Sequence, residues 1–144
     1  MKLMELAFEE AVKAFNQNEI PVGCVITLNG NVIARAHNTT IAECNNTKHA
    51  EINAINQALE FVNQKELKDC EMYVTLEPCP MCAGAIINTK IKRLYIGAQE
   101  PKSGCFGSKT DFSTLKFNHS PEVYHGICED KCKKIMVDFF ENKR

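Results

Sequence analysis

The chain has 144 residues and a mass of 16.2 kDa, which is the size of one typical domain. Hydrophobic residues make up 44% and charged residues 24% of it, so the composition excludes a disordered, collagen-like or coiled-coil protein. The formal net charge of −1 by itself predicts no nucleic-acid partner. We expect a single domain over residues 1–144.

Neither export nor a membrane is indicated by the sequence. No apolar run approaches the roughly 20 residues of a membrane-spanning helix. Residues 1–15 alternate Glu and Lys with apolar side chains and lack the apolar core of a signal peptide. The expected compartment is the cytoplasm, where eight cysteines are expected as metal ligands, a catalytic thiol or buried thiols.

The N-terminal part of the chain is predicted to form a helix and a hairpin. Apolar side chains recur at helical spacing over residues 4–15, with Glu and Lys on the opposite face, which is the pattern of an amphipathic helix. Two β-rich stretches, 25–28 and 32–36, then flank Asn29-Gly30-Asn31. Asn-Gly between two such stretches is typical of a tight hairpin turn.

Strands and helices alternate in the rest of the chain. A polar loop over 38–48 is followed by a predicted helix from His49 to Val62, a strand over 72–76 and a helix over 80–89. A strand over 93–97 and a loop over 97–111 come next. The final predicted helix has an apolar stripe that includes Cys128, Cys132, Ile135, Met136 and Phe139. A loop of the length of 97–111 in a compact domain is often functional. This order of elements predicts an α/β domain with helices packed on a central sheet.

Two short motifs, His49-Ala50-Glu51 and Pro78-Cys79-Pro80-Met81-Cys82, carry the chemistry. His49, Cys79 and Cys82 all lie at predicted helix N-termini, and the two cysteines are close enough at i and i+3 to hold one ion. A helix N-terminus and a metal both favour the thiolate that zinc binds. No fourth ligand is evident near either motif, and three protein ligands are typical of a catalytic zinc site. We expect one Zn²⁺ per chain.

Glu51 is interpreted as a proton carrier and not as a ligand. It lies in the same opening turn as His49, so the end of the helix can present both groups. A carboxylate beside a metal-activated water can take its proton and return it to a leaving nitrogen. The pattern H-x-E followed by P-C-x-x-C is the established signature of zinc-dependent nucleobase deaminases, so hydrolytic deamination is the predicted reaction.

Two other interpretations of these residues stay open. A structural zinc site would be completed by another cysteine, one of Cys24, Cys44, Cys70 or Cys105. A thioredoxin-like redox pair at Cys79 and Cys82 would leave the His-Ala-Glu motif unexplained. The cysteines outside the C-x-x-C pair are expected as buried thiols, and His37, His119 and His125 are expected to be structural.

Positive charge is concentrated between Lys90 and Lys116. This segment contains six Lys or Arg residues and only two acidic residues, Glu100 and Asp111. A local basic strip attracts phosphate even when the whole molecule is slightly acidic. Lys102 and Lys109 are the predicted RNA contacts in this strip. A solvated lysine-rich surface is the alternative.

With these residues in view, the chain resembles the bacterial tRNA-specific adenosine deaminases, the TadA family, from about Ala7 to Arg144. The zinc motifs are shared with cytosine, guanine and other deaminases. The more specific segments are 97–108, Phe117-Asn118-His119 with Pro121-Glu122-Val123, and Asp138-Phe139-Phe140.

The resemblance implies a three-layer α/β/α fold of the cytidine-deaminase type, with a central mixed sheet of about five strands, and a homodimer. It implies conversion of adenosine to inosine at the wobble position of a tRNA anticodon, typically of an arginine tRNA, with loss of ammonia. The implied site consists of zinc ligands His49, Cys79 and Cys82, the proton shuttle Glu51, and the substrate contacts Asn38 and Glu100. The expected partners are a tRNA anticodon stem-loop and a second copy of the chain, with no DNA and no membrane.

The sequence departs from the family pattern near the predicted RNA contacts. Thr39 and Gln99 stand where Arg is frequent, and Glu100 stands where Asp is usual. Two alternative functions remain: a deaminase of free guanine or cytosine, which needs no basic surface, and a non-catalytic RNA-binding protein with a structural zinc.

Overall fold

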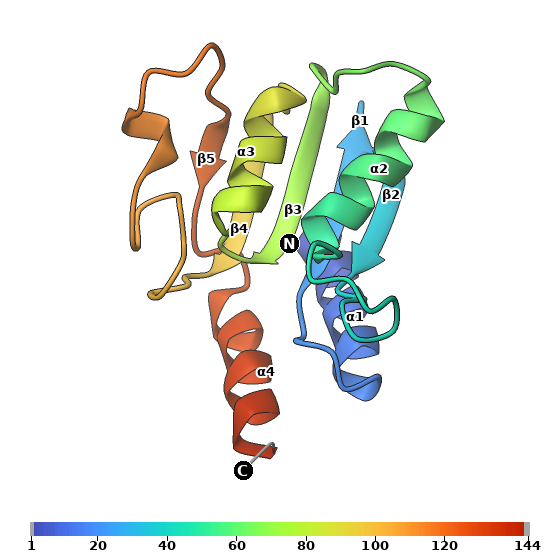
Figure 1. Ribbon diagram of the computed structural model, residues 1–144, viewed down its shortest axis with the longest axis vertical. Coiled ribbons are helices and arrows are strands. Elements are labelled where there is room, and N and C mark those ends of the chain that lie inside the picture. The colour runs from blue at the N-terminus through green and yellow to red at the C-terminus, as the bar shows by residue number, and fades with distance from the viewer. Residues whose placement is uncertain (1, 143–144) are drawn as a thin grey trace.

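The computed structural model describes residues 2–142, so the ends of the predicted domain, residues 1, 143 and 144, lie outside the described residues. In chain order the elements are α1 (Lys2–Asn16), β1 (Gly23–Leu28), β2 (Asn31–His37), α2 (Ala50–Val62), β3 (Cys70–Leu76), α3 (Pro80–Asn88), β4 (Arg93–Ala98), the short 3₁₀ helix η1 (Phe112–Thr114), β5 (Glu122–Tyr124) and α4 (Glu129–Asn142) (Figure 1).

The five strands form one mixed sheet in the order β2-β1-β3-β4-β5. β1 is antiparallel to both β2 and β3, whereas β3, β4 and β5 run parallel. The predicted hairpin is confirmed: Asn29 and Gly30 have φ of 53° and 80°, and positive φ at both central residues is the type I′ turn that Asn-Gly favours. β5 was missing from the strands predicted along the chain, because three residues are too few to show a pattern.

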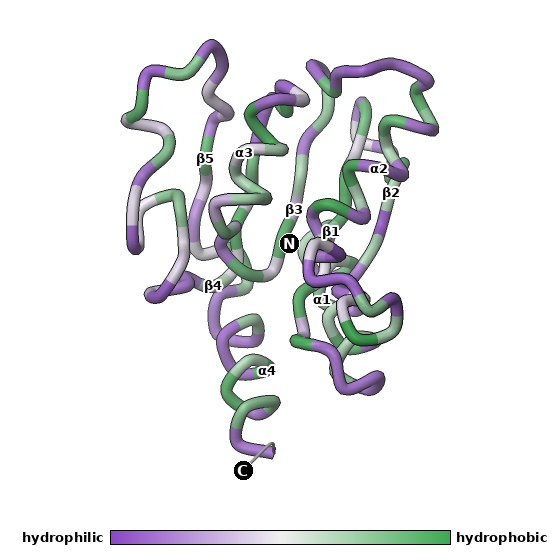
Figure 2. The backbone as a smooth tube through the Cα atoms, in the orientation of Figure 1, coloured by the Kyte–Doolittle hydropathy of each residue, from purple (hydrophilic) through white to green (hydrophobic). Residues whose placement is uncertain are grey.

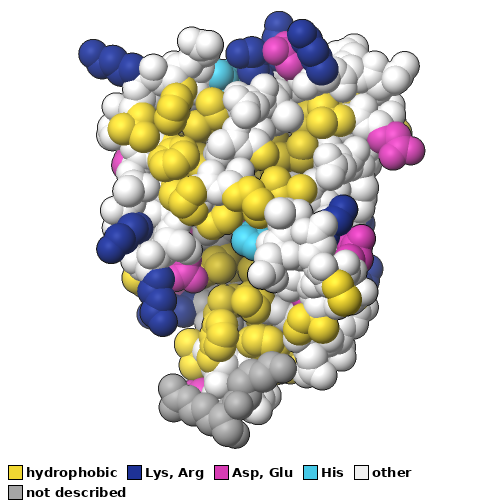
Figure 3. Space-filling view, in the orientation of Figure 1, with side chains coloured by type: hydrophobic (Ala, Val, Ile, Leu, Met, Phe, Trp, Pro, Cys, Tyr) yellow, Lys and Arg dark blue, Asp and Glu magenta, His cyan; other side chains and the backbone are white. Residues whose placement is uncertain are grey.

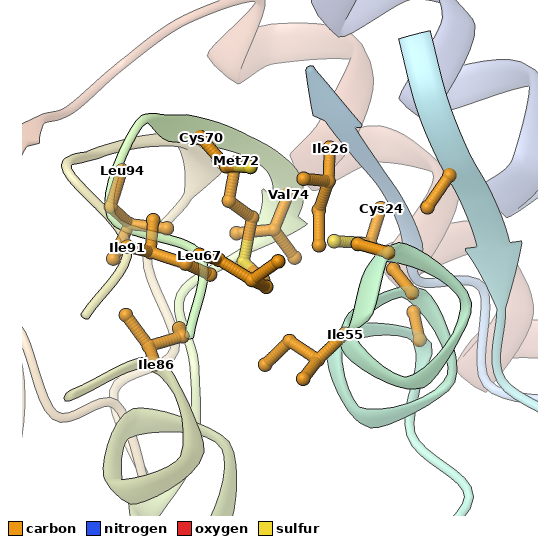
Figure 4. Packing of buried hydrophobic residues seen from close by; sticks show 14 of the residues in the cluster. Cys24, Ile26, Ile55, Leu67, Cys70, Met72, Val74, Ile86, Ile91 and Leu94 are labelled. Carbon is orange, nitrogen blue, oxygen red and sulfur yellow. The ribbon is translucent and has the colours of Figure 1, made fainter. Parts of the chain in front are cut away.

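Helices cover both faces of the sheet, which confirms the three-layer expectation (Figure 1). On one face, Ile55 of α2 and Ile86 of α3 point toward Met72 and Val74 of β3 (Figure 4). On the other face, residues of α1 and α4 pack with sheet residues in a second core: Met4, Ala7, Val25, Tyr73, Ala98 and Cys132. Figure 2 shows the segment between α2 and β3 as mainly hydrophilic, in contrast to these packed elements.

All eight cysteines are free thiols. Cys24, Cys70, Cys105 and Cys132 are buried as expected, but Cys44 is exposed because it lies on the polar loop between β2 and α2. Cys128 is only partly buried, since it precedes α4 with a positive φ of 56° and does not belong to the helix. Within residues 2–142, no helix has the length and apolar character needed to cross a bilayer.

Candidate metal centre and active site

Two helix N-termini bring the predicted ligands together. His49 is the N-cap residue of α2 and Cys79 that of α3, both in extended conformation, and neither side chain caps its own helix. Pro80 opens α3, where its fixed φ suits the first helical position. Cys82 follows in the first turn of α3. The three side chains can therefore approach one another between the starts of α2 and α3.

The spacing of the three donor atoms fits a zinc ion. The Nδ1 atom of His49 lies 3.6 Å from the Sγ of Cys79 and 3.6 Å from the Sγ of Cys82. Tetrahedral zinc with ordinary Zn–N and Zn–S bonds places its nitrogen and sulfur ligands about 3.5 Å apart. Among the described residues, no further His, Cys, Asp or Glu joins this group. The geometry thus favours a three-ligand site over a structural site completed by another cysteine.

The electrostatics of the two thiols suit a cation. The hydrogen bond between them and the neighbouring His49 together lower the pKa of Cys79 to about 4, which favours the thiolate. The same bond raises the pKa of Cys82. A divalent cation between the sulfurs favours the deprotonated form of both, and two thiolates with one imidazole are a ligand set that zinc prefers.

Glu51 lies in the first turn of α2 and is almost fully buried, with 4% of its surface exposed. Burial raises the pKa of its carboxyl to about 7. A carboxyl group with a pKa near neutrality can both accept and return a proton. Glu51 lines the same cavity as His49 and Cys79 but is not one of the grouped metal donors, so it is placed to act on what the cavity holds.

That cavity has a volume of about 170 Å³. Its walls come from seven parts of the chain, namely the starts of α2 and α3, the end of β3, the loops after Asn16, His37 and Ala98, and the helix α4. The lining residues are Ile20, Val22, Asn38, His49, Glu51, Leu76, Glu77, Cys79, Glu100, Ser103, Met136 and Phe140. A larger cavity of about 490 Å³ adjoins it and shares four of these residues, Leu76, Glu100, Met136 and Phe140. The site is therefore open on the side of α4.

Asn38 is buried in the wall of the active-site cavity. Its Oδ1 atom accepts a hydrogen bond from the backbone N–H of Ala50 at 2.7 Å. Asn53, one helical turn after His49, holds the chain on both sides of Asn38: its Nδ2 donates to the His37 carbonyl and to the Thr39 hydroxyl, each at 3.0 Å. Because Oδ1 already accepts this bond, the amide nitrogen Nδ2 of Asn38 is the atom that can donate a hydrogen bond to a ligand.

The predicted RNA contacts divide into two groups. Glu100 lines both cavities and Lys102 the larger one, whereas Lys109 is exposed and lines neither. The basic residues of the predicted strip are divided between the two ends of β4. Lys90 and Lys92 precede β4 and Lys102 and Lys109 follow it, so a strand of roughly 20 Å separates the pairs.

The charge of Arg93, which belongs to the expected strip, is paired with two carboxylates. Its guanidinium forms ion pairs with Glu71 at 2.6 Å and with Glu122 at 2.8 Å. Those two carboxylates come from β3 and β5 on either side of β4. Their cross-strand positions could not be read from the sequence.

Several residues of the site were not found by sequence reasoning. They are Glu77, Ser103, Asn53 and the α4 residues Met136 and Phe140. Glu77 carries a faint signal, as a lone acid that ends an apolar strand next to the Cys-x-x-Cys motif. The apolar stripe that holds Met136 indicates core packing as readily as a cavity wall. Phe140 was noted only as part of the family-like segment Asp138-Phe139-Phe140, with no role in the site.

Comparison with known proteins agrees with this site. A family model described as MafB19-like deaminase matches residues 1–144. The fold and the His-Cys-Cys group beside a buried glutamate thus belong to a deaminase. The chain is 46% identical to the tRNA-specific adenosine deaminase of Agrobacterium fabrum over 98% of its own length and 93% of that protein, and 39% identical to the one of Bacillus subtilis over 98% and 88%. The chain therefore belongs to the tRNA-specific adenosine deaminases.

Solved structures support the same assignment. A structure from a study of A-to-I editing by tRNA:A34 deaminases matches with a TM-score of 0.89 and 45% identity, covering 93% of this chain and 98% of that one. A guanine deaminase from Bacillus subtilis matches with a TM-score of 0.65 and 27% identity, over 81% and 85% of the two chains. The expected cytidine-deaminase-type fold with a five-stranded mixed sheet is confirmed.

Proposed function

We propose that this chain is a zinc-dependent enzyme that hydrolyses adenosine to inosine at the wobble position of a tRNA anticodon, releasing ammonia, and that an arginine tRNA is its substrate. One observation carries the proposal. Three donors at zinc spacing, His49, Cys79 and Cys82, open onto the same small cavity as the buried carboxyl of Glu51, in a member of the adenosine deaminase family.

The chemistry divides between the metal and the protein. Bound zinc, one per chain, supplies the Lewis acidity that makes water acidic near neutral pH. Glu51 takes a proton from the attacking water and returns it to the leaving nitrogen. The water oxygen bonds to C6 of the adenine, the bond from C6 to the amino nitrogen breaks, and ammonia leaves.

Asn38 orients the substrate as a hydrogen-bond donor. Its Oδ1 is engaged by Ala50, so the free Nδ2 meets an acceptor on the nucleoside. Adenine presents such acceptors at its ring nitrogens. This donor is fixed to the α2 start, so the base is held in one orientation relative to His49 and Glu51.

The openness of the site favours an RNA substrate over a free base. The larger cavity continues the active-site cavity along α4 and is lined by charges of both signs, with Lys102 and Lys133 beside Glu100, Glu129 and Glu141. The two lysines are the groups that can contact phosphates on either side of the target nucleotide. An anticodon base already lies in a loop, so little pairing energy is lost when it enters the cavity.

A second copy of the chain is the proposed protein partner. Figure 3 shows hydrophobic side chains gathered over α3 and the segment that carries η1 and β5, where Met81, Leu115 and Phe117 are exposed. Exposed apolar clusters of this kind mark interaction surfaces. We place the dimer in the cytoplasm with its tRNA and assign it no DNA or membrane partner.

The test compares substrates under one set of conditions. Purified protein is given an arginine-tRNA anticodon stem-loop with adenosine at the wobble position, the same stem-loop with guanosine there, and free guanine and cytosine. Ammonia release is measured for each. We expect ammonia from the adenosine stem-loop alone. Release from free guanine or cytosine without release from the stem-loop would identify the rival free-base deaminase instead.

A further inference from the structure

Glu77 is a buried carboxylate that the proposed chemistry does not use. It lies between the end of β3 and Cys79, and only 2% of it is exposed. Both of its oxygens accept hydrogen bonds from the segment 100–108. Oε1 accepts from the Glu100 N–H at 3.1 Å and from the Ser108 hydroxyl, and Oε2 accepts from the N–H groups of Phe106 at 2.9 Å and Ser108 at 3.1 Å.

The charge of Glu77 is stabilised by this segment and not by a cation. Within residues 2–142, no Lys, Arg or His forms an ion pair with it. Three backbone N–H groups and one hydroxyl converge on the carboxylate, which is how turns of backbone enclose an anion. The segment 100–108 is therefore folded around one side chain.

Gly104 gives independent evidence for how closely the segment encloses this carboxylate. A Cβ atom at position 104 would lie 2.4 Å from the Cδ and 2.5 Å from the Oε1 of Glu77, and 2.6 Å from the carbonyl oxygen of Glu100. Only a glycine leaves room for this approach. The carboxylate and the glycine thus fit as a matched pair.

The segment held by Glu77 forms a wall of the active site. Glu100 and Ser103 line the active-site cavity, and Lys102 lines the larger cavity beside it. The segment is also bonded to the chain just before Cys79, because the Cys105 N–H donates to the Pro78 carbonyl at 3.0 Å. A change at Glu77 acts first on the wall that would meet RNA, since its four hydrogen bonds all come from segment 100–108, whereas His49 and Cys82 belong to α2 and α3.

We propose that Glu77 is a positioning residue for the RNA substrate: it holds residues 100–108 in the conformation that receives the anticodon loop. It sets the KM for the RNA, whereas kcat and zinc binding do not depend on it. This inference rests on the proposed function, because it takes the anticodon stem-loop as the substrate.

The test is Glu77→Gln, which keeps the shape and removes the charge. A glutamine amide has one acceptor oxygen and one donor nitrogen, so two of the four converging donors would face an N–H₂ group. We expect KM for the stem-loop to rise at least about tenfold, the loss of roughly one good hydrogen bond. We expect kcat to stay within about threefold of wild type and zinc to stay at one per chain, because no metal ligand is touched.

Further variants keep the test decisive if Glu77→Gln folds poorly. Gly104→Ala places a methyl group against the same carboxylate and should raise KM in the same way. Ser108→Ala removes the hydroxyl that donates to Glu77 and should raise KM to a smaller extent. Glu60→Gln is the matched control, since Glu60 is an exposed carboxylate on α2, and it should behave as wild type. Circular dichroism melting checks that each variant is folded.

The possible results separate this inference from the function itself. Absence of inosine with the zinc-loaded wild type would overturn the proposed function. With an active wild type, an unchanged KM in folded Glu77→Gln and Gly104→Ala would overturn the role of Glu77. A parallel fall of kcat and zinc content would also overturn it, because Glu77 would then support the metal centre.

Discussion

The side chain of Asn38 and the backbone of Ala50 are joined by a buried hydrogen bond of 2.7 Å, with the amide oxygen accepting. Ala50 stands between His49 and Glu51. The bond therefore attaches the proposed substrate contact directly to the helix start that carries His49, a proposed metal ligand, and Glu51, the proposed proton carrier. Asn38, His49 and Glu51 are thus fixed relative to one another by the start of α2, which is how a site holds reacting groups in a fixed geometry.

The two amide atoms of Asn38 can be tested separately. Asn38→Asp keeps an oxygen for the Ala50 N–H but replaces the donor Nδ2 by a second acceptor. We expect kcat/KM for the stem-loop to fall at least about tenfold, since a donor to the substrate is lost, with melting temperature and zinc content close to wild type. Asn38→Ala should in addition lower the melting temperature, because the Ala50 N–H is left unsatisfied. Wild-type kinetics for Asn38→Asp would remove this residue from the substrate contacts.

Loss of one thiol ligand should remove both the metal and the activity. Cys79→Ser replaces a thiolate by a hydroxyl, a poor zinc ligand, so we expect zinc measured by mass spectrometry to drop below one per chain. Inosine formation should fall by on the order of a hundredfold or more. Cys44→Ser is the control, because Cys44 is exposed on a loop, and it should retain zinc and activity. Full zinc occupancy in Cys79→Ser would contradict the assigned ligand set.

Stability at acid pH should depend on Glu10, which is buried and accepts hydrogen bonds from Lys13 at 2.8 Å, Arg35 at 2.8 Å and His37 at 2.9 Å. Burial by itself raises the pKa of this carboxyl, but the three bonds outweigh it and bring the pKa from 4.5 to about 2. A carboxyl whose pKa is lower in the folded state contributes stability that is complete above pH 4.5 and is lost as the pH falls toward 2.

Urea unfolding at pH 7 and at pH 3 measures this contribution. Glu10→Gln should lower the free energy of unfolding at pH 7 by on the order of 2–3 kcal/mol and by less at pH 3, which flattens the pH dependence. Glu9→Gln is the comparison, because Glu9 is exposed and only pairs with Arg35 at 3.2 Å, and it should change little. An equal loss for Glu10→Gln at both pH values would mean that its effect does not come from its charge.

The division of the basic residues by β4 leads to a prediction about salt. Lys102→Gln and Lys109→Gln should each weaken stem-loop binding and lower the slope of log Kd against log salt by about 1, as expected for the loss of one phosphate contact. Lys90→Gln and Lys92→Gln, at the other end of β4, should leave both unchanged. Fluorescence anisotropy at several salt concentrations measures the slopes. Equal effects from the two pairs would mean that the basic residues at both ends of β4 contact the RNA.

Features encoded locally could be predicted from the sequence. The hairpin was found because Asn29 and Gly30 tolerate the positive φ that its turn requires. The group of His49, Cys79 and Cys82 could be predicted because these residues stand in short, chemically specific motifs at helix starts. Each of these signals spans only a few neighbouring residues.

Features formed by distant pairing could not be predicted. β5 exists because Glu122 pairs with the β4 strand, for example through its N–H to the Lys92 carbonyl at 3.0 Å, and nothing within its three residues specifies a strand. The partners of Glu77 lie 23 to 31 residues away along the chain. The division of the basic residues by β4 was not predicted for a related reason, since residues close in sequence can lie at opposite ends of a strand.

The most direct test of the catalytic assignment measures inosine and zinc in the same samples. Wild type and Glu51→Ala are each incubated with the wobble-adenosine stem-loop, inosine is detected by sequencing, and zinc per chain is determined for both. We predict inosine from the wild type, one zinc in each protein, and a rate for Glu51→Ala lower by about 10²–10⁴-fold, the contribution of a positioned proton carrier. Inosine formed by zinc-loaded Glu51→Ala at the wild-type rate would contradict the account.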